Sequence, residues 1–311
     1  MSTLVCEVSF MTTELQNKID RSICILRNFQ PQDEAYFLCY SGGKDSDAVR
    51  LLADMAGVNY ELHNNHTTVD APETVRYIRE IMSTYGELKY ITDENGARIA
   101  SYGDKGFIHF PKKTMWQLIE EYGMPPARIA RYCCKDLKEG GGKGRLKVTG
   151  VRKAESVQRA KNGGLVQIKS KPKTNQKLAE KIGVEYETTP KGGIVLNMDN
   201  DDSRRMVEQC YRTSVTLVNP ILDWTDEDVW DFLESQNCKS NPLYAKGYKR
   251  IGCIGCPMAG KGRIKEFEDY PQYYKMYLNA FGKMIEKHKH KWAADSMFTS
   301  PEAVMKWWLE C

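Results

Sequence analysis

An apolar run that leads directly into two glycines constrains this chain more than any other feature. Residues 35–40 (AYFLCY) are typical of a buried β-strand, and residues 41–46 (SGGKDS) follow at once. The next residues carry apolar side chains at helical spacing, at Ala48, Val49, Leu51, Leu52 and Met55. We therefore expect a strand, a glycine loop and a helix in succession, which is the first unit of an α/β fold.

The same alternation continues along the chain. We expect further strands at 59–63, 88–91 and 146–151, and helices at 72–85 and 113–122. The pattern predicts an α/β fold with a doubly wound, mainly parallel sheet. Ligands of such sheets bind where the strands end, so the loops 41–46 and 152–159 are expected to meet there.

The expected domain organisation has three parts. Residues 1–34 form an N-terminal helical segment, since 12–28 place Leu15, Ile19, Ile23 and Leu26 at spacings of three and four. Residues 35–230 form the nucleotide-binding domain, interrupted by a Lys- and Gly-rich insertion at about 161–215. Residues 231–311 form a helical, cysteine-rich subdomain, preceded by Thr225 as a helix N-cap.

Composition narrows the functional class only a little. The chain has no apolar run of the roughly 18 residues that a membrane helix needs and no secretory leader, so we expect a cytoplasmic protein without a membrane partner. Nine Lys and Arg residues lie between 152 and 181 against two Glu, although the net charge is only +4. This segment is either a surface for a polyanion or a solvated loop.

The glycine loop has the residues that bind phosphate. Gly42 and Gly43 let successive backbone N–H groups point at one position at the start of a helix, which favours an anion. Lys44 adds a positive charge, Ser41 and Ser46 add hydroxyl groups, and Asp45 adds a carboxylate that can orient Mg²⁺ or a hydrogen-bond donor. The spacing differs from that of the common P-loop.

The intact SGGKDS motif resembles the loop of the PP-loop ATP pyrophosphatases. The resemblance implies that ATP, with Mg²⁺, is held by residues 41–46 and that Lys44 and Asp45 take part in catalysis. It also implies cleavage between the α- and β-phosphates, which yields AMP or an adenylated intermediate together with pyrophosphate.

Two cysteine pairs stand out among the ten cysteines. Cys133 and Cys134 are adjacent, and Cys253 and Cys256 form a C-x-x-C turn. Without a secretory leader these are expected to be reduced thiols. Four thiolates suit an iron–sulfur cluster or zinc, and free thiols are the third interpretation.

The C-C and C-x-x-C-P pairs together resemble those of the phosphoadenosine phosphosulfate (PAPS) reductase family. This resemblance implies a [4Fe-4S] cluster on the four cysteines, with zinc as the lesser alternative. Residues 150–159 resemble the family's G-x-R-x-x-E-S-x-x-R loop over the nucleotide. On this basis we expect Gly150, Arg152, Glu155 and Ser156 to bind ATP, and Arg152 and Arg159 to act in catalysis.

The sequence also departs from the sulfonucleotide reductases of that family. Their loop typically loses the lysine that this chain keeps at position 44, and they end in Glu-Cys-Gly-x-His, whereas this chain ends at Glu310-Cys311. Cys311 is thus either a sulfur carrier or an ordinary chain end.

An intact ATP loop beside cluster cysteines resembles the ATP-using sulfurtransferases of DNA phosphorothioate modification. The implied partners are a nucleic acid, DNA rather than RNA, and a cysteine desulfurase as sulfur donor; a homodimer is a further expectation. The alternatives are a PAPS or adenylyl sulfate reductase that releases sulfite, a tRNA thiolation enzyme, and a nucleotide- and cluster-binding sensor without turnover.

Overall fold

The computed structural model describes residues 12–291 and 298–310 of the chain. Two compact units make up the fold, and each contains two separate stretches of sequence. The first unit comprises 12–63 with 142–245, and the second comprises 64–141 with 246–310. The units are described in turn.

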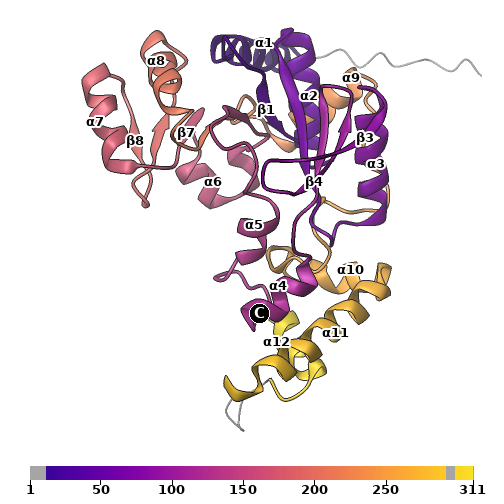
Figure 1. The fold of residues 1–311 in the computed structure, drawn as a ribbon. Helices are drawn as coiled ribbons and strands as arrows, with labels where there is room; N and C mark the ends of the chain where they lie inside the picture. Colours follow the sequence, from indigo (N-terminus) through magenta and orange to yellow (C-terminus); the bar gives the residue numbers. More distant parts are fainter. Residues whose placement is uncertain (1–11, 292–297, 311) are drawn as a thin grey trace, which may run out of the picture. The chain divides into compact units, whose positions relative to one another are not determined.

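The first unit contains a sheet with helices packed against it (Figure 1). Its strands are β1 (Tyr36–Cys39), β2 (Tyr60–Asn65, whose last two residues belong to the second unit), β6 (Lys147–Val148), β7 (Val166–Ile168), β8 (Glu187–Thr188), β9 (Ile194–Leu196) and β10 (Thr216–Val218). Its α-helices are α1 (Thr13–Asn28), α2 (Lys44–Ala56), α6 (Val157–Asn162), α7 (Pro172–Ile182), α8 (Asp201–Cys210) and α9 (Asp226–Ser235), and a 3₁₀ turn η1 covers Lys153–Glu155.

The centre of this sheet is parallel, as the strand–helix alternation predicts. The strands pair in the order β2-β1-β6-β10, with Leu38 opposite Leu62 and Val148. These three side chains have no exposed surface, so they form the middle of the core. The carboxyl ends of β1 and β6 lead into the loops 41–46 and 152–159, which therefore lie at one edge of the sheet.

The outer strands are antiparallel. β7 pairs antiparallel with β10, and β9 and β8 continue the sheet in the same manner. The segment 161–215, which the sequence marks as an insertion, thus supplies three strands and the helices α7 and α8, which pack on each other (Figure 1). The α/β class is confirmed, and the parallel arrangement is limited to the central strands.

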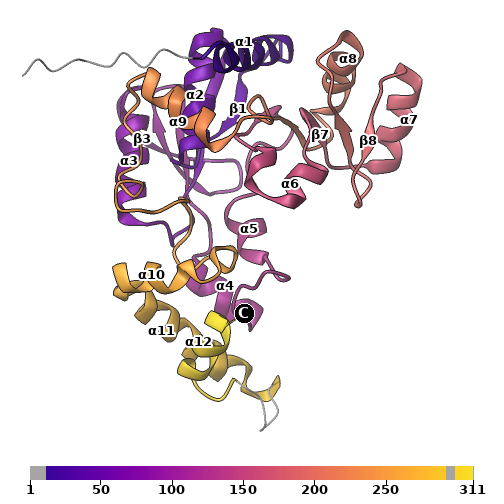
Figure 2. The same ribbon diagram turned by 180° about the vertical axis from the view of Figure 1, so that it is seen from behind.

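Helices α1, α2 and α9 follow their sequence signals. Thr12 caps α1 by accepting from Leu15 N, and Leu15, Ile19 and Leu26 are buried. At α9, Thr225 Oγ1 accepts from Asp228 N, and the Asp228 carboxylate accepts from Thr225 N at 2.7 Å, which is a reciprocal capping box. Helix α9 contacts α2, as the view from behind shows (Figure 2).

The second unit combines a three-stranded meander with helices. Strands β3 (Leu88–Thr92), β4 (Arg98–Tyr102) and β5 (Gly106–His109) pair antiparallel in that order. The helices are α3 (Pro72–Ser83), α4 (Met115–Tyr122), α5 (Tyr132–Leu137), α10 (Gly262–Asp269), α11 (Pro271–His288) and α12 (Pro301–Glu310), with 3₁₀ turns η2 (Pro257–Ala259) and η3 (Lys289–Lys291).

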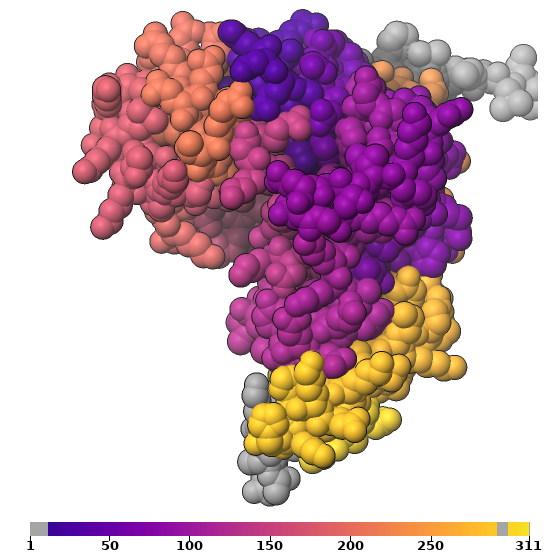
Figure 3. Space-filling view, in the orientation of Figure 1, coloured from indigo at the N-terminus to yellow at the C-terminus, as the bar shows by residue number. Residues whose placement is uncertain are grey.

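Aromatic side chains fill the helical core of the second unit. Trp308 is fully buried, its ring centroid lies 4.8 Å from that of Tyr277, and its Nε1 donates to Pro126 O at 2.6 Å. Helix α11 packs on α4 and α12, and the yellow surface of the C-terminal helices adjoins the purple surface of the α4 region in Figure 3. Of the described helices, none is long and apolar enough to cross a membrane.

Candidate active site

The 41–46 loop joins β1 to α2 and is closed by one serine side chain. Gly42 has φ +71°, a conformation that glycine adopts without steric cost, and Gly43 is the N-cap of α2. Ser46 Oγ accepts from Gly43 N at 3.2 Å and from Ser41 N at 3.3 Å, and it donates to Gly43 O at 2.7 Å. The result is a rigid turn at a helix N-terminus, the kind of site that attracts anions.

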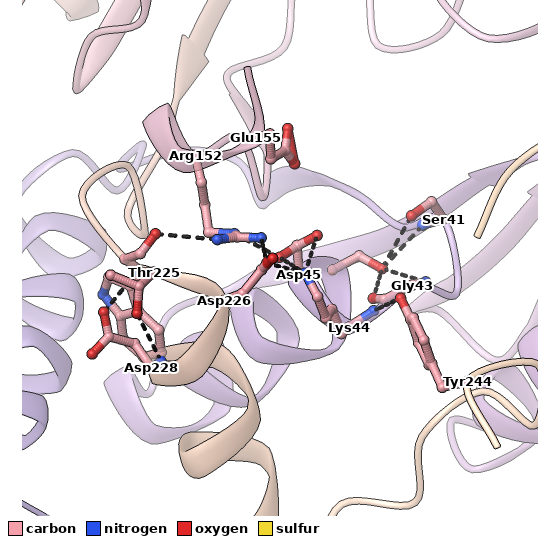
Figure 4. Close-up of polar contacts among 12 residues, drawn as sticks. Ser41, Gly43, Lys44, Asp45, Arg152, Glu155, Thr225, Asp226, Asp228 and Tyr244 are labelled. Carbon is pink, nitrogen blue, oxygen red and sulfur yellow. Dashed lines mark hydrogen bonds and ion pairs between the residues drawn. The ribbon is translucent and has the colours of Figure 1, made fainter. Parts of the chain in front are cut away.

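Four charged side chains form an alternating ring beside this turn (Figure 4). Lys44 Nζ lies 3.1 Å from Asp45 Oδ1 and 2.9 Å from Asp226 Oδ1. Arg152 donates to the same two oxygens, through Nε to Asp45 at 2.7 Å and through Nη2 to Asp226 at 2.5 Å. The Oδ1 atom of Asp45 and the Oδ1 atom of Asp226 therefore each receive a hydrogen bond from both Lys44 and Arg152.

Burial is unequal within this ring. The side chain of Arg152 is 1% exposed and that of Lys44 is 8% exposed, whereas that of Asp226 is 74% exposed. Trp224 O accepts a further hydrogen bond from Arg152 Nη1 at 3.2 Å. The hydrogen bond from Lys44, followed by that from Arg152, holds the pKa of Asp226 below its ordinary value, so this carboxyl is ionised at neutral pH.

Two residues after α9 complete the surroundings of the loop. Tyr244 Oη accepts from Lys44 N at 2.9 Å, and Asn241 Nδ2 donates to Gly42 O at 2.9 Å. Burial raises the pKa of Tyr244, so the phenol keeps its proton and can donate it to another acceptor. Asp226, Asn241 and Tyr244 were not among the site residues expected from the sequence.

The 150–159 loop reaches the site through Gly150 and Arg152. A Cβ atom at Gly150 would lie 2.8 Å from Asp45 O, so only glycine fits this close approach of the two loops. Arg159 pairs with Glu155 one helical turn away, and Ser156 caps α6 by accepting from Arg159 N at 3.2 Å. Glu155 has no contact drawn to the ring in Figure 4. The structure thus brings Arg152 to the glycine loop and gives Glu155, Ser156 and Arg159 local partners.

The cysteine pairs belong to the second unit. Cys133 and Cys134 lie on α5, and Cys253 and Cys256 lie in the turn before η2. That turn is held by hydrogen bonds from Ile254 N to Val69 O at 2.8 Å and from Gly255 N to the Glu266 carboxylate at 2.7 Å. A fixed turn keeps the two sulfurs of the C-x-x-C pair in a defined place.

Electrostatics link the two pairs. The pKa of Cys133 is raised, first by its hydrogen bond with Cys134 and in smaller part by Cys253 and Cys256. The same hydrogen bond, assisted by Arg131 Nη2 at 3.2 Å from Cys134 Sγ, lowers the pKa of Cys134 to about 5. The hydrogen bond from Cys133 and the guanidinium of Arg131 thus favour the thiolate form of Cys134.

The sulfurs of the two cysteine pairs are chemically suited to bind a group that thiolates hold. In the described ranges, however, no three His, Cys, Asp or Glu side chains are placed to hold a single metal ion. Cys311, which the sequence leaves as either a sulfur carrier or an ordinary chain end, lies outside the described residues.

A parallel sheet, a glycine loop after its first strand and buried Lys and Arg side chains at that loop define an α/β protein of the PP-loop type. The family model of the phosphoadenosine phosphosulfate reductase domain matches residues 35–259. The chain belongs to this family, as the two cysteine pairs and the 150–159 motif predict.

The individual proteins that the chain resembles share less than 30% of its residues. An uncharacterized protein of Methanocaldococcus jannaschii is 22% identical over 85% of this chain and 45% of its own length, and an uncharacterized 37.8 kDa protein of Escherichia phage 186 is 29% identical over 75% and 70%. The chain thus spans about half the length of the first of these relatives. The crystal structure of the Candida auris PAPS reductase is similar with a TM-score of 0.42 and 13% identity, covering 78% of this chain and 96% of that one.

Proposed function

We propose that this protein is an ATP-dependent sulfurtransferase that forms AMP and pyrophosphate. The observation that supports it most is the ring of Lys44, Asp45, Arg152 and Asp226 at the intact glycine loop. Two buried cations at a helix N-terminus offset the charge of a leaving pyrophosphate where water screens little.

The proposed reaction has two displacements. A substrate oxygen attacks the α-phosphorus, the bond to the β-phosphate oxygen breaks, and its electron pair leaves with pyrophosphate. Sulfur at the sulfide level then attacks the adenylated centre, and the oxygen leaves with AMP. A persulfide from a cysteine desulfurase would serve as donor if a thiol supplies the two electrons that reduce it. Lys44 and Arg152 would bind the departing phosphates, and Asp45, which accepts from both of them, would orient Mg²⁺.

The cysteine set is proposed to hold a [4Fe-4S] cluster. Cys133, Cys134, Cys253 and Cys256 would be its ligands, and the cluster would supply redox chemistry or sulfur handling. The lowered pKa of Cys134 supports a thiolate ligand.

The proposed acceptor is a nucleic acid, DNA before RNA. Helix α7 carries Lys173, Lys177 and Lys181, three exposed lysines one helical turn apart. Such a stripe fits a phosphate backbone, because each neutralised phosphate releases counterions. Replacing all three lysines of this stripe with Glu should weaken DNA binding at least tenfold and reduce the dependence of binding on salt. The same replacement of the exposed Lys275, Lys283 and Lys306 should change neither.

The testing experiment is an anaerobic assay of AMP and pyrophosphate formation from ATP, with DNA, RNA and adenylyl sulfate as competing substrates. We expect DNA-stimulated AMP formation that Lys44→Ala abolishes. Stimulation by tRNA alone would assign tRNA thiolation, sulfite release without ATP cleavage would assign a reductase, and ATP binding without AMP would assign a sensor.

A further inference from the structure

Asp226 accepts its hydrogen bonds from the side chains that the proposed function assigns to phosphate. Its Oδ1 lies 2.9 Å from Lys44 Nζ and 2.5 Å from Arg152 Nη2. An oxygen shared by two cations at hydrogen-bond distance is how a phosphate oxygen sits at such a pair. The carboxylate and a nucleotide phosphate therefore need the same donors.

The charges of the ring also indicate that Asp226 and a nucleotide phosphate compete for one site. The ring contains two cations and two carboxylates, so it is close to neutral as it stands. A polyphosphate gains little from a neutral site, and it gains strongly from one in which a carboxylate has left.

Asp226 is the carboxylate that can leave. Its side chain is 74% exposed, against 24% for Asp45, which also neighbours Lys44 in α2. The capping box of Thr225 and Asp228 holds the first turn of α9 without using Asp226. The Asp226 side chain can therefore turn to solvent while α9 stays folded.

We propose that Asp226 is a positioning residue that holds Lys44 and Arg152 together and competes with the nucleotide phosphates for them. It keeps the two side chains converged on one point, and it lowers the affinity for ATP and for pyrophosphate alike. Since pyrophosphate is a product, this competition also speeds its release. The inference rests on the proposed function only in taking the loop as a site for nucleotide phosphate.

Tyr244 contributes in the same place. Its hydroxyl oxygen accepts from Lys44 N at 2.9 Å. This N–H belongs to the first turn of α2, where backbone N–H groups have no acceptor within the helix. Helix α9 and the segment after it thus supply internal acceptors for both the side chain and the backbone of Lys44.

The test is the dissociation constant of ATP and of pyrophosphate, measured by titration calorimetry with Mg²⁺ and with EDTA. Asp226→Asn keeps the size and one acceptor oxygen but removes the charge, and we expect it to bind both ligands about 3–10-fold more tightly. Glu227→Gln, which removes one charge from the same helix turn at an exposed residue, should bind like the wild type. In turnover, Asp226→Asn should lower KM for ATP without raising kcat, which a merely structural defect would not do.

The outcomes separate cleanly. Equal or weaker binding by Asp226→Asn overturns the inference, and weakening seen only with Mg²⁺ would make Asp226 a metal ligand instead. If Asp226→Asn does not fold, Asp226→Ala gives the same reading by the same measurement. Wild type that binds neither ligand, with Lys44→Ala no different, would refute the proposed function itself.

Discussion

Asp226 Oδ1 lies 2.9 Å from Lys44 Nζ, although 182 residues separate the two in sequence. The contact joins the first turn of α9 to the first turn of α2, so two helix N-termini meet at the glycine loop. Arg152, which lies in the loop after β6, bridges the carboxylates of Asp45 and Asp226. The site is therefore built by tertiary packing around a local motif.

Replacement of Arg152 tests how far the ring supports the fold. Arg152→Ala leaves Asp45 and Asp226 without their guanidinium partner, and we expect unfolding to become easier by about 2–4 kcal/mol. Arg152→Lys keeps the charge but loses the fork that reaches both oxygens, so it should recover only part of the loss. Denaturant titration measures both.

Arg159→Ala is the control on the same loop. Its side chain is 43% exposed and pairs with Glu155, so stability should change by no more than about 0.5 kcal/mol. A loss as large as that of Arg152→Ala would contradict this reading of the loop.

Gly150 is predicted to tolerate no side chain. In Gly150→Ala the new Cβ would lie 2.8 Å from the backbone oxygen of Asp45, so one of the two loops must move. We expect a loss of about 1–3 kcal/mol and at least tenfold weaker ATP binding. Gly140→Ala, where a Cβ meets nothing within 4 Å, should match the wild type in thermal unfolding and ATP titration.

Metal content should depend on the four paired cysteines. Anaerobically purified protein is expected to contain about four iron and four sulfide per chain. Cys253→Ser should lose most of both, whereas Cys24→Ser, an exposed thiol, should lose neither. About one zinc per chain and no sulfide would show that the cluster assignment is wrong.

Glu266 should make stability depend on pH. Burial raises its pKa to about 7, and its carboxylate accepts from Gly255 N at 2.7 Å. Because the folded pKa lies above the ordinary value of 4.5, the folded state binds more protons, and the protonated form contributes stability below about pH 4.5. That contribution falls as pH rises and is lost above pH 7.

Glu266→Gln removes this dependence. Relative to wild type it should gain about 1–2 kcal/mol between pH 5 and pH 8, measured by denaturant unfolding at both values. Glu268→Gln, an exposed residue of the same helix, should follow the wild type. A parallel pH dependence of wild type and Glu266→Gln would contradict the assignment.

The sequence contained enough to locate the glycine loop and Arg152, because both belong to short motifs that directly follow strands. Asp226 was recognisable only as an acidic residue in the first turn of a helix. Its role depends on the packing of α9 on α2, and no local pattern encodes that contact.

Two parts of the fold were also missed for different reasons. Strand β3 was predicted at 88–91, but its hairpin partner β4 was not, although Asn95-Gly96 in the turn is a readable hairpin signal and Asp93 Oδ1 accepts from Asn95 N at 2.9 Å. Strands β7 and β9 have three residues each, which is too short for a periodicity to appear. The pairing of β7 with β10 and of β9 with β7 depends on residues far apart in the sequence.

The glycine loop at 41–46 is proposed to direct cleavage to the inner phosphate bond of ATP. The most direct measurement is the identity of the products, by chromatography of ATP labelled at the α- and γ-positions after anaerobic incubation with DNA and a sulfur donor. We expect AMP and pyrophosphate in equal amounts from the wild type and neither product from Lys44→Ala. Formation of ADP and inorganic phosphate would contradict it.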